Sequence, residues 1–309
     1  MPCKTLPLNV LPCSLLKDCA DVFTPAIARL ANLSLQAGMF PARYKLPLLN
    51  KAGLDRSSLA NYRPISNLST VFKILQRLVQ ARLRPHLMNS TNFSQFQSAN
   101  RQDHCTETTL LDVLNNVYTV ADEKQVTVLI GFDLSAAFDT VCHQTLLQRL
   151  QSEFSVSGTA LSWIRSYLTD RKQFIELGLR KLPETKLEVG VPQGSVLRPL
   201  PFAVYCSPAA DVIASHGVRH HQYADDIKLH LAMRANNTAA GLSTLATCTA
   251  DVKLWFMQND LQLNPDKSEA LVMGTANQLR AASSLTSVSY THLTCRRSYA
   301  CRSRWSPYH

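Results

Sequence analysis

The sequence predicts an α+β fold, because helical and strand-like segments are grouped along the chain instead of alternating regularly. Apolar residues recur at helical spacing in four long segments, which are 14–40, 70–87, 106–120 and 242–257. Continuous or alternating apolar residues, which are typical of strands, fill three shorter segments, which are 126–132, 220–231 and 269–273. No segment of the sequence repeats another.

The N-terminal part is predicted to be mostly helical. Pro25 interrupts the first helical segment and Pro41 ends it. Residues 61–66, Asn-Tyr-Arg-Pro-Ile-Ser, are expected to be extended, since a residue before proline is pushed out of the helical region. The helix over 70–87 has four basic residues on its polar side, which are Lys73, Arg77, Arg82 and Arg84.

The middle of the chain contains its most strand-like segment, 126–132, which is almost entirely apolar and ends on Asp133. Residues 140–168 return to helical spacing, with a break at Ser157 and Gly158. Residues 173–191 alternate and predict a hairpin that turns at Leu182 and Pro183. Residues 200–215 are apolar enough to form one buried helix.

The C-terminal part carries a second acidic position. Residues 220–231 alternate and have Tyr-Ala-Asp-Asp, 223–226, in their middle, so Asp225 and Asp226 are predicted at the tip of a hairpin. The neighbouring His220 and His221 are expected to be half-exposed strand residues rather than metal ligands. A helix over 242–257 and an extended segment over 261–265 lead into the last strand.

Composition limits the class of protein. Of 309 residues, 46% are hydrophobic and 17% are charged, which predicts a globular chain. No apolar stretch approaches the ~18 residues of a membrane-spanning helix, and no signal peptide is visible. We therefore expect neither a secreted nor a membrane protein. The nine cysteines are scattered and never spaced as Cys-x-x-Cys, which argues for a reducing compartment and against a disulfide framework or zinc site.

The net charge of +10 suits a polyanionic partner. The positive charge is unevenly distributed along the chain, since from Arg280 onward there are five arginines and no acidic residue. The rest of the chain is only mildly basic, so charge by itself does not establish nucleic-acid binding.

Two acidic sites at strand ends are the strongest candidates for chemistry. Asp133 follows the apolar strand, and Asp225 and Asp226 lie at the hairpin tip. Carboxylates on rigid strand ends can converge on hard divalent cations, and two such ions support in-line phosphoryl transfer. Taken singly, each aspartate could equally have a structural role, because aspartate commonly caps helices and forms turns.

Two further features lie between these acidic sites. Residues 191–195, Val-Pro-Gln-Gly-Ser, follow the predicted hairpin, and Gly194 would let the backbone approach a planar ligand while Gln193 offers an amide. Phe138 lies five residues after Asp133, where an aromatic ring could stand against the 2′ position of a sugar. The simpler readings are a Pro-Gly turn and an ordinary core phenylalanine.

In order and near-correct spacing, these motifs resemble the reverse transcriptase of LINE-type (non-LTR) retrotransposons from about residue 12 to about 280. The motifs are Asn-Tyr-Arg-Pro-Ile-Ser at 61–66, Phe-Gln-Ser at 96–98, Phe-Asp-Leu-Ser-Ala-Ala-Phe-Asp at 132–139, Val-Pro-Gln-Gly-Ser-Val at 191–196, Tyr-Ala-Asp-Asp at 223–226 and Leu-Asn-Pro-Asp-Lys at 263–267. The resemblance implies a right-hand polymerase with fingers and a palm of antiparallel strands, its thumb truncated. It divides the chain into an N-terminal extension with fingers (1–125), a palm (126–275) and a truncated or non-native tail (276–309).

The resemblance also implies an activity and its residues. Asp133, Asp225 and Asp226 match the palm carboxylates that hold two Mg²⁺ ions, or Mn²⁺ in their place. The expected activity is RNA-directed DNA synthesis from an RNA template and a DNA primer, using deoxynucleoside triphosphates. In this family synthesis takes place in the nucleus, and no membrane is involved. The oligomeric state, the element of origin and the template specificity do not follow from the sequence.

Five residues match the nucleotide site of the family. Arg63 falls where a fingers arginine meets the triphosphate, and Lys267 matches a basic residue near the pyrophosphate. Phe138 matches the sugar gate, while Gln193 and Gly194 match the loop that packs on the template base and the incoming nucleotide. Phe138 disfavours an RNA-dependent RNA polymerase, since RNA synthesis needs a smaller or hydrogen-bonding gate.

Departures from the pattern suggest a partial or decaying copy. Where the family usually has Gly-Pro-Leu-Leu-Phe, this chain has Arg198-Pro-Leu-Pro201-Phe. Arg198 brings a bulky cation to a small-residue position, and Pro201 would destabilise a helix if it lay past the first turn. Residues after about 287 resemble nothing in the family. The alternative hypothesis is therefore a catalytically inactive remnant that binds nucleic acid.

Overall fold

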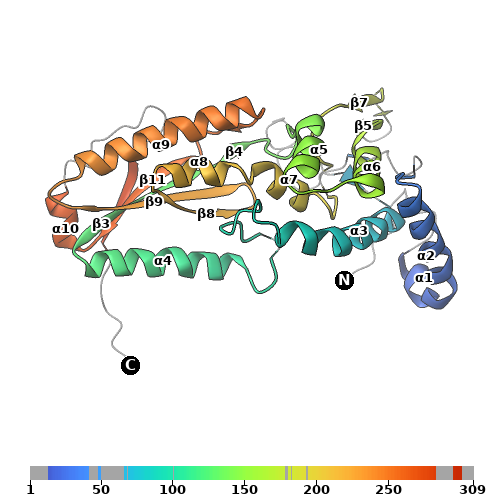
Figure 1. Ribbon diagram of the computed structural model, residues 1–309, viewed down its shortest axis with the longest axis horizontal. Helices are drawn as coiled ribbons and strands as arrows, with labels where there is room; N and C mark the ends of the chain where they lie inside the picture. Colours follow the sequence, from blue (N-terminus) through green and yellow to red (C-terminus); the bar gives the residue numbers. More distant parts are fainter. Residues whose placement is uncertain are drawn as a thin grey trace. The chain divides into compact units, whose positions relative to one another are not determined.

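The computed structural model describes residues 13–41, 48–49, 66–67, 69–99, 101–177, 180–181, 183–192, 194–282 and 295–300. The chain forms two compact units (Figure 1). The first unit comprises residues 1–93 and 138–205, and the second comprises 94–137 and 206–309. Helices and mainly antiparallel strands coexist in both units, which confirms the α+β class. The proposed division into fingers, palm and tail stays a prediction.

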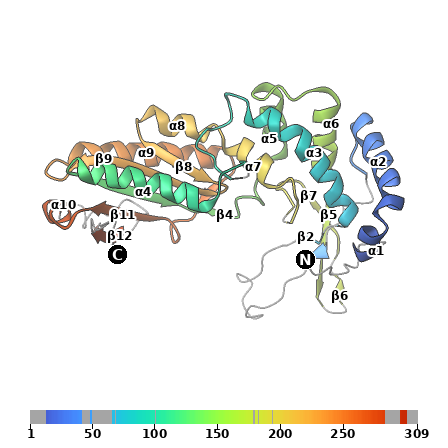
Figure 2. The same cartoon turned by 90° about the horizontal axis from the view of Figure 1, so that it is seen from below.

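The second unit is built on a five-stranded sheet in the order β12-β11-β3-β9-β8. Its strands are β3 (Gln125–Phe132), β8 (Arg219–Tyr223), β9 (Asp226–Arg234), β11 (Glu269–Gly274) and β12 (Cys295–Ala300). All neighbours pair antiparallel except β11 and β12, which run parallel at one edge (Figure 2). A separate two-stranded sheet joins β4 (Leu134–Ser135) to β10 (Gln262–Leu263).

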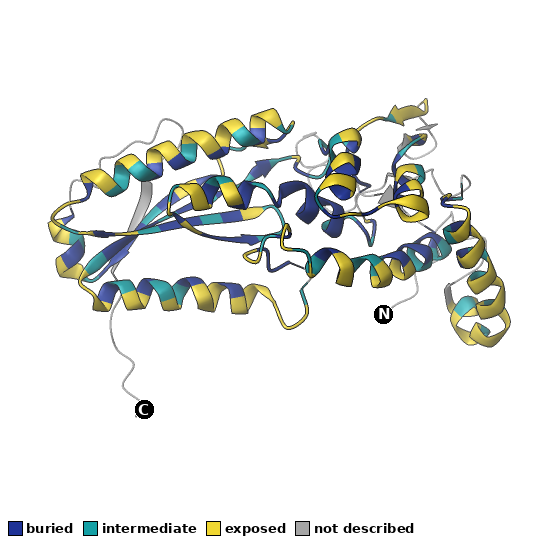
Figure 3. Cartoon of the chain, in the orientation of Figure 1, coloured by how far each residue is buried: buried dark blue, intermediate teal, exposed yellow. Residues whose placement is uncertain are grey.

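Helices cover both faces of this sheet (Figure 1). On one face lies α4 (Thr106–Asp122), on the other lie α8 (Ala209–Ser215) and α9 (Ala239–Gln258), and α10 (Ala276–Ala281) packs beside β11. Figure 3 shows an exposed outer side and a buried inner side on α4 and α9. Because β3 is covered on both faces, all of its residues are buried or half-buried, as an almost continuous apolar run predicts.

The first unit is mainly helical. It contains α1 (Cys13–Asp18), α2 (Ala20–Gln36), α3 (Thr70–Met88), α5 (His143–Ser152), α6 (Gly158–Leu168) and all but the last residue of α7 (Pro199–Cys206). Its sheet contains β1 (Leu48–Leu49), β2 (Ser66–Asn67), β5 (Arg171–Leu177), β6 (Arg180–Lys181) and β7 (Thr185–Leu187). Aromatic rings of Phe40, Phe72, Trp163 and Tyr167 form its core, with ring centroids 5.0 Å apart for Phe40 and Phe72.

Prolines explain where the observed helices differ from the predicted ones. Pro25 is exposed and lies inside α2 without ending it; the break falls earlier, at Cys19. The predicted single helix over 200–215 is two helices, α7 and α8, separated at Ser207 and Pro208. Pro201 lies in the first turn of α7, where the helix needs no backbone donor. It therefore does not destabilise this helix.

The remaining predicted elements are mostly confirmed. The strands at 126–132 and 269–273 and the hairpin around 223–226 are present. In the region of the predicted hairpin, 173–191, β5 pairs antiparallel with both β6 and β7. Leu182, at the predicted turn, lies outside the described residues. Within the described part of the chain, no helix is both long enough and apolar enough to cross a membrane.

Candidate active site

Asp133 lies directly after β3, at the end of the sheet where β8 and β9 meet in a hairpin. Its side chain is 38% exposed. The backbone of Asp133 is bound on both sides by the segment that follows β10. The N–H of Asn264 donates to the Asp133 carbonyl at 2.8 Å, and the N–H of Asp133 donates to Ser268 Oγ at 3.3 Å. Asp133 therefore occupies a defined position rather than a free loop.

The same segment brings a cation to Asp133. Lys267 Nζ lies 3.8 Å from Asp133 Oδ2. The hydroxyl of Ser268 donates to the Asn264 carbonyl at 2.7 Å and closes the turn between them. The Leu-Asn-Pro-Asp-Lys motif thus forms one short turn that holds Asp133 by its backbone and presents Lys267 to its carboxylate.

The second acidic site is a tight hairpin turn. Tyr223 pairs with Asp226, so Ala224 and Asp225 are the two central residues of the turn. Ala224 has a φ of +55°, a left-handed conformation that alanine rarely adopts. Asp225 is half-exposed and Asp226 is exposed, and Lys228 Nζ lies 3.5 Å from Asp226 Oδ2.

Strand register brings the two acidic sites to one end of the sheet. Phe132, the last residue of β3, pairs with Ile227 of β9. Asp133 follows this pair along one strand and Asp226 precedes it along the other, so their backbones are at adjacent positions. Antiparallel neighbours lie about 5 Å apart. The expectation that Asp133 and the Asp225–Asp226 pair share one end of the sheet therefore agrees with the backbone register.

The carboxylates suit a divalent metal by chemistry and by backbone position. Oxygen donors are the ligands that Mg²⁺ prefers. In the described residues, however, no three carboxylate, imidazole or thiol groups gather closely enough to hold a metal ion. Asp133 contacts Lys267, and Asp226 contacts Lys228. The metal ligands stay a prediction.

In the first unit, Phe138 belongs to the same local structure as the Val-Pro-Gln-Gly-Ser loop. The N–H of Val191 donates to the Phe138 carbonyl at 2.8 Å, and the N–H of Gly190 donates to the Val141 carbonyl at 2.8 Å. The imidazole of His143 donates to the Gly190 carbonyl at 2.7 Å, and burial lowers the pKa of His143, which favours the neutral ring. Gly194 has a φ of +89°.

Arg198 contacts Phe138 directly. Its guanidinium carbon lies 3.7 Å from the centre of the Phe138 ring, and the ring of Phe202 lies 4.4 Å away at an angle of 36°. The Phe138 ring is thus in contact with both the Arg198 guanidinium and the Phe202 ring. The family's small residue at position 198 would remove the guanidinium contact.

A buried polar network also connects the Val-Pro-Gln-Gly-Ser loop to α3 and α6. The Gln76 Oε1 atom, on α3, accepts hydrogen bonds from Val196 N–H at 2.7 Å and from Ser195 Oγ at 3.1 Å. The Tyr167 hydroxyl lies 2.7 Å from Ser195 Oγ. Sequence reasoning missed Gln76, because nothing in the pattern of α3 distinguishes a buried glutamine from the helix's other polar residues.

Two predicted nucleotide-site residues, Arg63 and Gln193, lie outside the described residues. Gln97, in the Phe-Gln-Ser motif, is a second residue whose role the sequence does not reveal. His220 and His221 are buried rather than half-exposed: the His220 ring packs against the Phe96 ring, and His221 lies beside Asp112 of α4.

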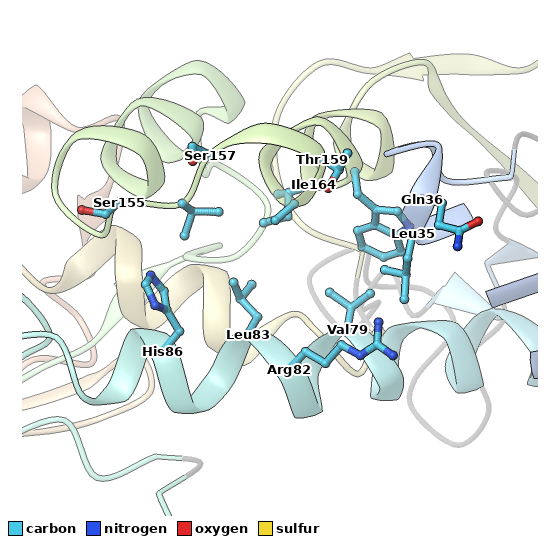
Figure 4. Close-up of a pocket in the computed structure, with 13 residues that line it drawn as sticks. Leu35, Gln36, Val79, Arg82, Leu83, His86, Ser155, Ser157, Thr159 and Ile164 are labelled. Atoms are coloured by element: carbon cyan, nitrogen blue, oxygen red, sulfur yellow. The ribbon is translucent and has the colours of Figure 1, made fainter. Parts of the chain in front are cut away.

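A cavity of about 580 Å³ lies elsewhere in the first unit, between α2, α3 and α6 (Figure 4). Apolar side chains line most of it, with Arg82 and His86 on the α3 side. None of the predicted site residues lines this cavity. The candidate chemistry therefore belongs to the end of the sheet and not to this cavity.

Comparison with solved structures finds the telomerase of Candida tropicalis. The apo enzyme truncated from its C-terminal domain aligns with a TM-score of 0.46 and 12% identity, over 64% of this chain and 40% of that one.

Comparison with curated proteins finds polymerases of mobile elements. A probable RNA-directed DNA polymerase from transposon BS of Drosophila melanogaster is 29% identical over 252 residues, which are 78% of this chain and 27% of that protein. The RNA-directed DNA polymerase from mobile element jockey of the same species is 27% identical over 250 residues, with the same coverage. The chain thus spans about a quarter of the length of these relatives.

The family model described as reverse transcriptase (RNA-dependent DNA polymerase) matches residues 49–294. This range includes Asp133, the hairpin turn and Lys267. It begins later and ends later than the range over which the motifs were expected to resemble the family. Together with the mobile-element relatives, the match confirms the resemblance to LINE-type enzymes, and the chain belongs to the reverse transcriptase family.

Proposed function

We propose that this chain catalyses RNA-directed DNA synthesis, adding deoxynucleotides to the 3′-hydroxyl of a DNA primer on an RNA template. The observation that carries the proposal is the meeting of Asp133 and the Asp225–Asp226 turn at one end of paired strands, in a member of the reverse transcriptase family. By family resemblance, synthesis would take place in the nucleus.

In this proposal Asp133, Asp225 and Asp226 hold two Mg²⁺ ions. When bound, the metals would lower the pKa of the primer hydroxyl and stabilise the leaving pyrophosphate. The side chains of Asp133 and Asp226 are partly exposed, and each contacts a lysine that a bound metal would replace as its partner. Lys267, next to Asp133, would then be free to donate a proton to the pyrophosphate.

The nucleotide would be selected by the first unit. Phe138 would exclude a 2′-hydroxyl, Gln193 and Gly194 would pack on the base pair, and Arg63 would bind the triphosphate. The support for this assignment is the hydrogen bond between Phe138 and Val191, which ties the proposed gate to the proposed base-packing loop.

The test is primer extension by the purified chain on an RNA template, with and without Mg²⁺. We expect incorporation that depends on the metal and is abolished by Asp225→Asn, which keeps the size of the side chain and removes its charge. Lys172→Met, far from the carboxylates in sequence and on β5, is the matched control. Incorporation that persists in Asp225→Asn would contradict the assignment.

A second hypothesis is favoured by the net charge of +10 and by the departure at Arg198. It holds that the chain binds nucleic acid electrostatically and does not catalyse synthesis. Binding that weakens steeply with salt, without incorporation, would support this reading. An RNA-synthesising enzyme would instead incorporate ribonucleotides as readily as deoxynucleotides.

A further inference from the structure

Gln97 is buried beside the hairpin turn of the second unit, with 1% of its surface exposed. Both the nitrogen and the oxygen of its side-chain amide bind the same turn residue, Ala224. The Gln97 Nε2 atom donates to the Ala224 carbonyl at 3.2 Å, and the Ala224 N–H donates to Gln97 Oε1 at 2.9 Å. The amide therefore satisfies both backbone groups of Ala224.

The backbone around Gln97 is itself held against β8. The N–H of Gln222 donates to the Phe96 carbonyl and the N–H of Ser98 donates to the Gln222 carbonyl, each at 2.9 Å. Gln97 Oε1 also accepts the N–H of Ala99 at 3.1 Å. The backbone of Gln97 is thus bound to β8, and three hydrogen bonds hold its amide, two to Ala224 and one to Ala99.

The turn needs such support because Ala224 is strained. Its φ of +55° is easily adopted by glycine and disfavoured for alanine, whose Cβ approaches the backbone. The mirror-type turns of two-residue hairpins require this conformation. Without a partner for its N–H and carbonyl, Ala224 would relax toward more common backbone angles and carry Asp225 with it.

We propose that Gln97 is a positioning residue that holds the Asp225–Asp226 turn in its strained form before metal or nucleotide arrives. The inference rests on the proposed function only in taking Asp225 and Asp226 as metal ligands. Glutamine suits this role because one side chain supplies both a donor and an acceptor at the right reach. Glutamate keeps the acceptor and loses the donor, and leucine loses both.

The first measurement needs neither metal nor nucleotide. Hydrogen exchange at the Ala224 amide is followed in the metal-free chain for Gln97→Leu, Gln97→Glu and Ser98→Ala. We expect exchange to accelerate at least tenfold in Gln97→Leu and less in Gln97→Glu, which retains the acceptor for this N–H. Ser98→Ala is the matched control, since it removes the neighbouring buried hydrogen bond to His221, at 2.7 Å, and leaves the turn alone.

The second measurement is the Mg²⁺ concentration that gives half-maximal primer extension. We expect it to rise five- to tenfold in Gln97→Leu, with kcat reduced and the KM for deoxynucleotide unchanged. Ala224→Gly should partly rescue Gln97→Leu, because glycine adopts a positive φ without strain. If Gln97 only stabilised the fold, Ala224→Gly would not restore the Mg²⁺ requirement of Gln97→Leu.

Unchanged exchange at Ala224 in Gln97→Leu overturns the proposal, whatever the activity of the chain. If Gln97→Leu does not fold, Gln97→Glu decides by the same two measurements. If the unaltered chain incorporates nothing, the proposed function fails while the exchange experiment still tests the hold on the turn. Equal effects of Gln97→Leu and Ser98→Ala on the metal requirement would also overturn the proposal.

Discussion

Lys267 Nζ lies 3.8 Å from Asp133 Oδ2, across a turn that binds the Asp133 backbone from both sides. Both side chains are open to solvent, with 69% of Lys267 and 38% of Asp133 exposed. An ion pair this exposed contributes little to stability. Its placement beside a proposed metal ligand therefore points to chemistry rather than to folding.

Lys267→Met should lower the rate of nucleotide incorporation at least tenfold and leave the free energy of unfolding within about 0.5 kcal/mol of the unaltered chain. The reason is that methionine is an unbranched side chain of similar length that lacks the proton that would go to pyrophosphate. Single-turnover primer extension and urea unfolding measure the two effects. The exposed pair of Lys172 and Glu184, 3.4 Å apart, gives the control, since Lys172→Met should change neither. A loss of stability with an unchanged rate would contradict this role.

Arg198→Gly should reduce discrimination against ribonucleotides about fivefold, because a cation over an aromatic face contributes on the order of 1 kcal/mol to holding Phe138 in place. The measurement is the ratio of kcat/KM for a deoxynucleotide and the matching ribonucleotide. Phe138→Ala gives the upper limit of the effect. Arg198→Lys keeps the charge without the flat guanidinium and should fall between. If Arg198→Gly only raises deoxynucleotide use and leaves the ratio unchanged, Arg198 obstructs the pocket and does not position the ring.

Gly190→Ala should lower the free energy of unfolding by several kcal/mol, on the order of a severe steric defect. A Cβ at position 190 would lie 2.6 Å from the Asp139 carbonyl oxygen, and the φ of +81° adds backbone strain. Gly158→Ala is the matched control in the same unit, because its φ is also positive, at +58°, but no atom lies within 4 Å of the added Cβ. It should lose only about 1 kcal/mol. Equal losses from the two substitutions would show that strain, and not the contact with Asp139, determines the effect.

Much of the second unit could be predicted because its strands have simple patterns. The apolar run ending on Asp133 and the alternation around Tyr223 identify β3, β8 and β9, and the two acidic motifs then fall at their ends. The sequence could not show that α4 covers β8 and buries His221, because the identity of the covering element depends on long-range packing.

The contacts that hold the site were harder to predict. Gln76 and Gln97 both support their loops with buried amides, and a buried glutamine has the same sequence signature as an exposed one. The effect of Pro201 depended on where α7 begins, a boundary that patterns locate only within a few residues. Contact between Arg198 and Phe138 joins positions 60 residues apart and leaves no local pattern.

Gln76→Leu should destabilise the chain by about 2 kcal/mol and raise the KM for deoxynucleotide several-fold. Leucine fills a similar volume but leaves the half-buried Val196 N–H without its acceptor, so the loop around Gly194 loses its support from α3. Urea unfolding and steady-state kinetics measure both effects. Gln80→Leu, one turn further along α3 on a half-buried side chain, is the control and should change neither quantity. Equal behaviour of the two variants would contradict the role assigned to Gln76.

Acid should destabilise the second unit through His220. Burial, followed by the nearby His221 and His230, lowers the pKa of His220 to about 4. The unfolded chain takes up a proton at this histidine as the pH falls below about 6.5, while the folded chain does not until about pH 4. The free energy of unfolding should therefore fall by about 3 kcal/mol from this group between pH 7 and pH 4. Burial lowers the pKa of His221 and His230 as well, which adds in the same direction.

Substitution separates this titration from packing. His220→Phe keeps a ring against Phe96, whose centroid lies 4.6 Å from that of His220, and removes the ionisable group. The loss of stability between pH 7 and pH 4, measured by urea unfolding at each pH, should shrink by about 3 kcal/mol in this variant. Gln222→Leu, a buried polar residue on the same strand, should shift stability equally at both pH values because it does not titrate. A pH dependence that His220→Phe leaves intact would mean that other groups, and not His220, carry the sensitivity to acid.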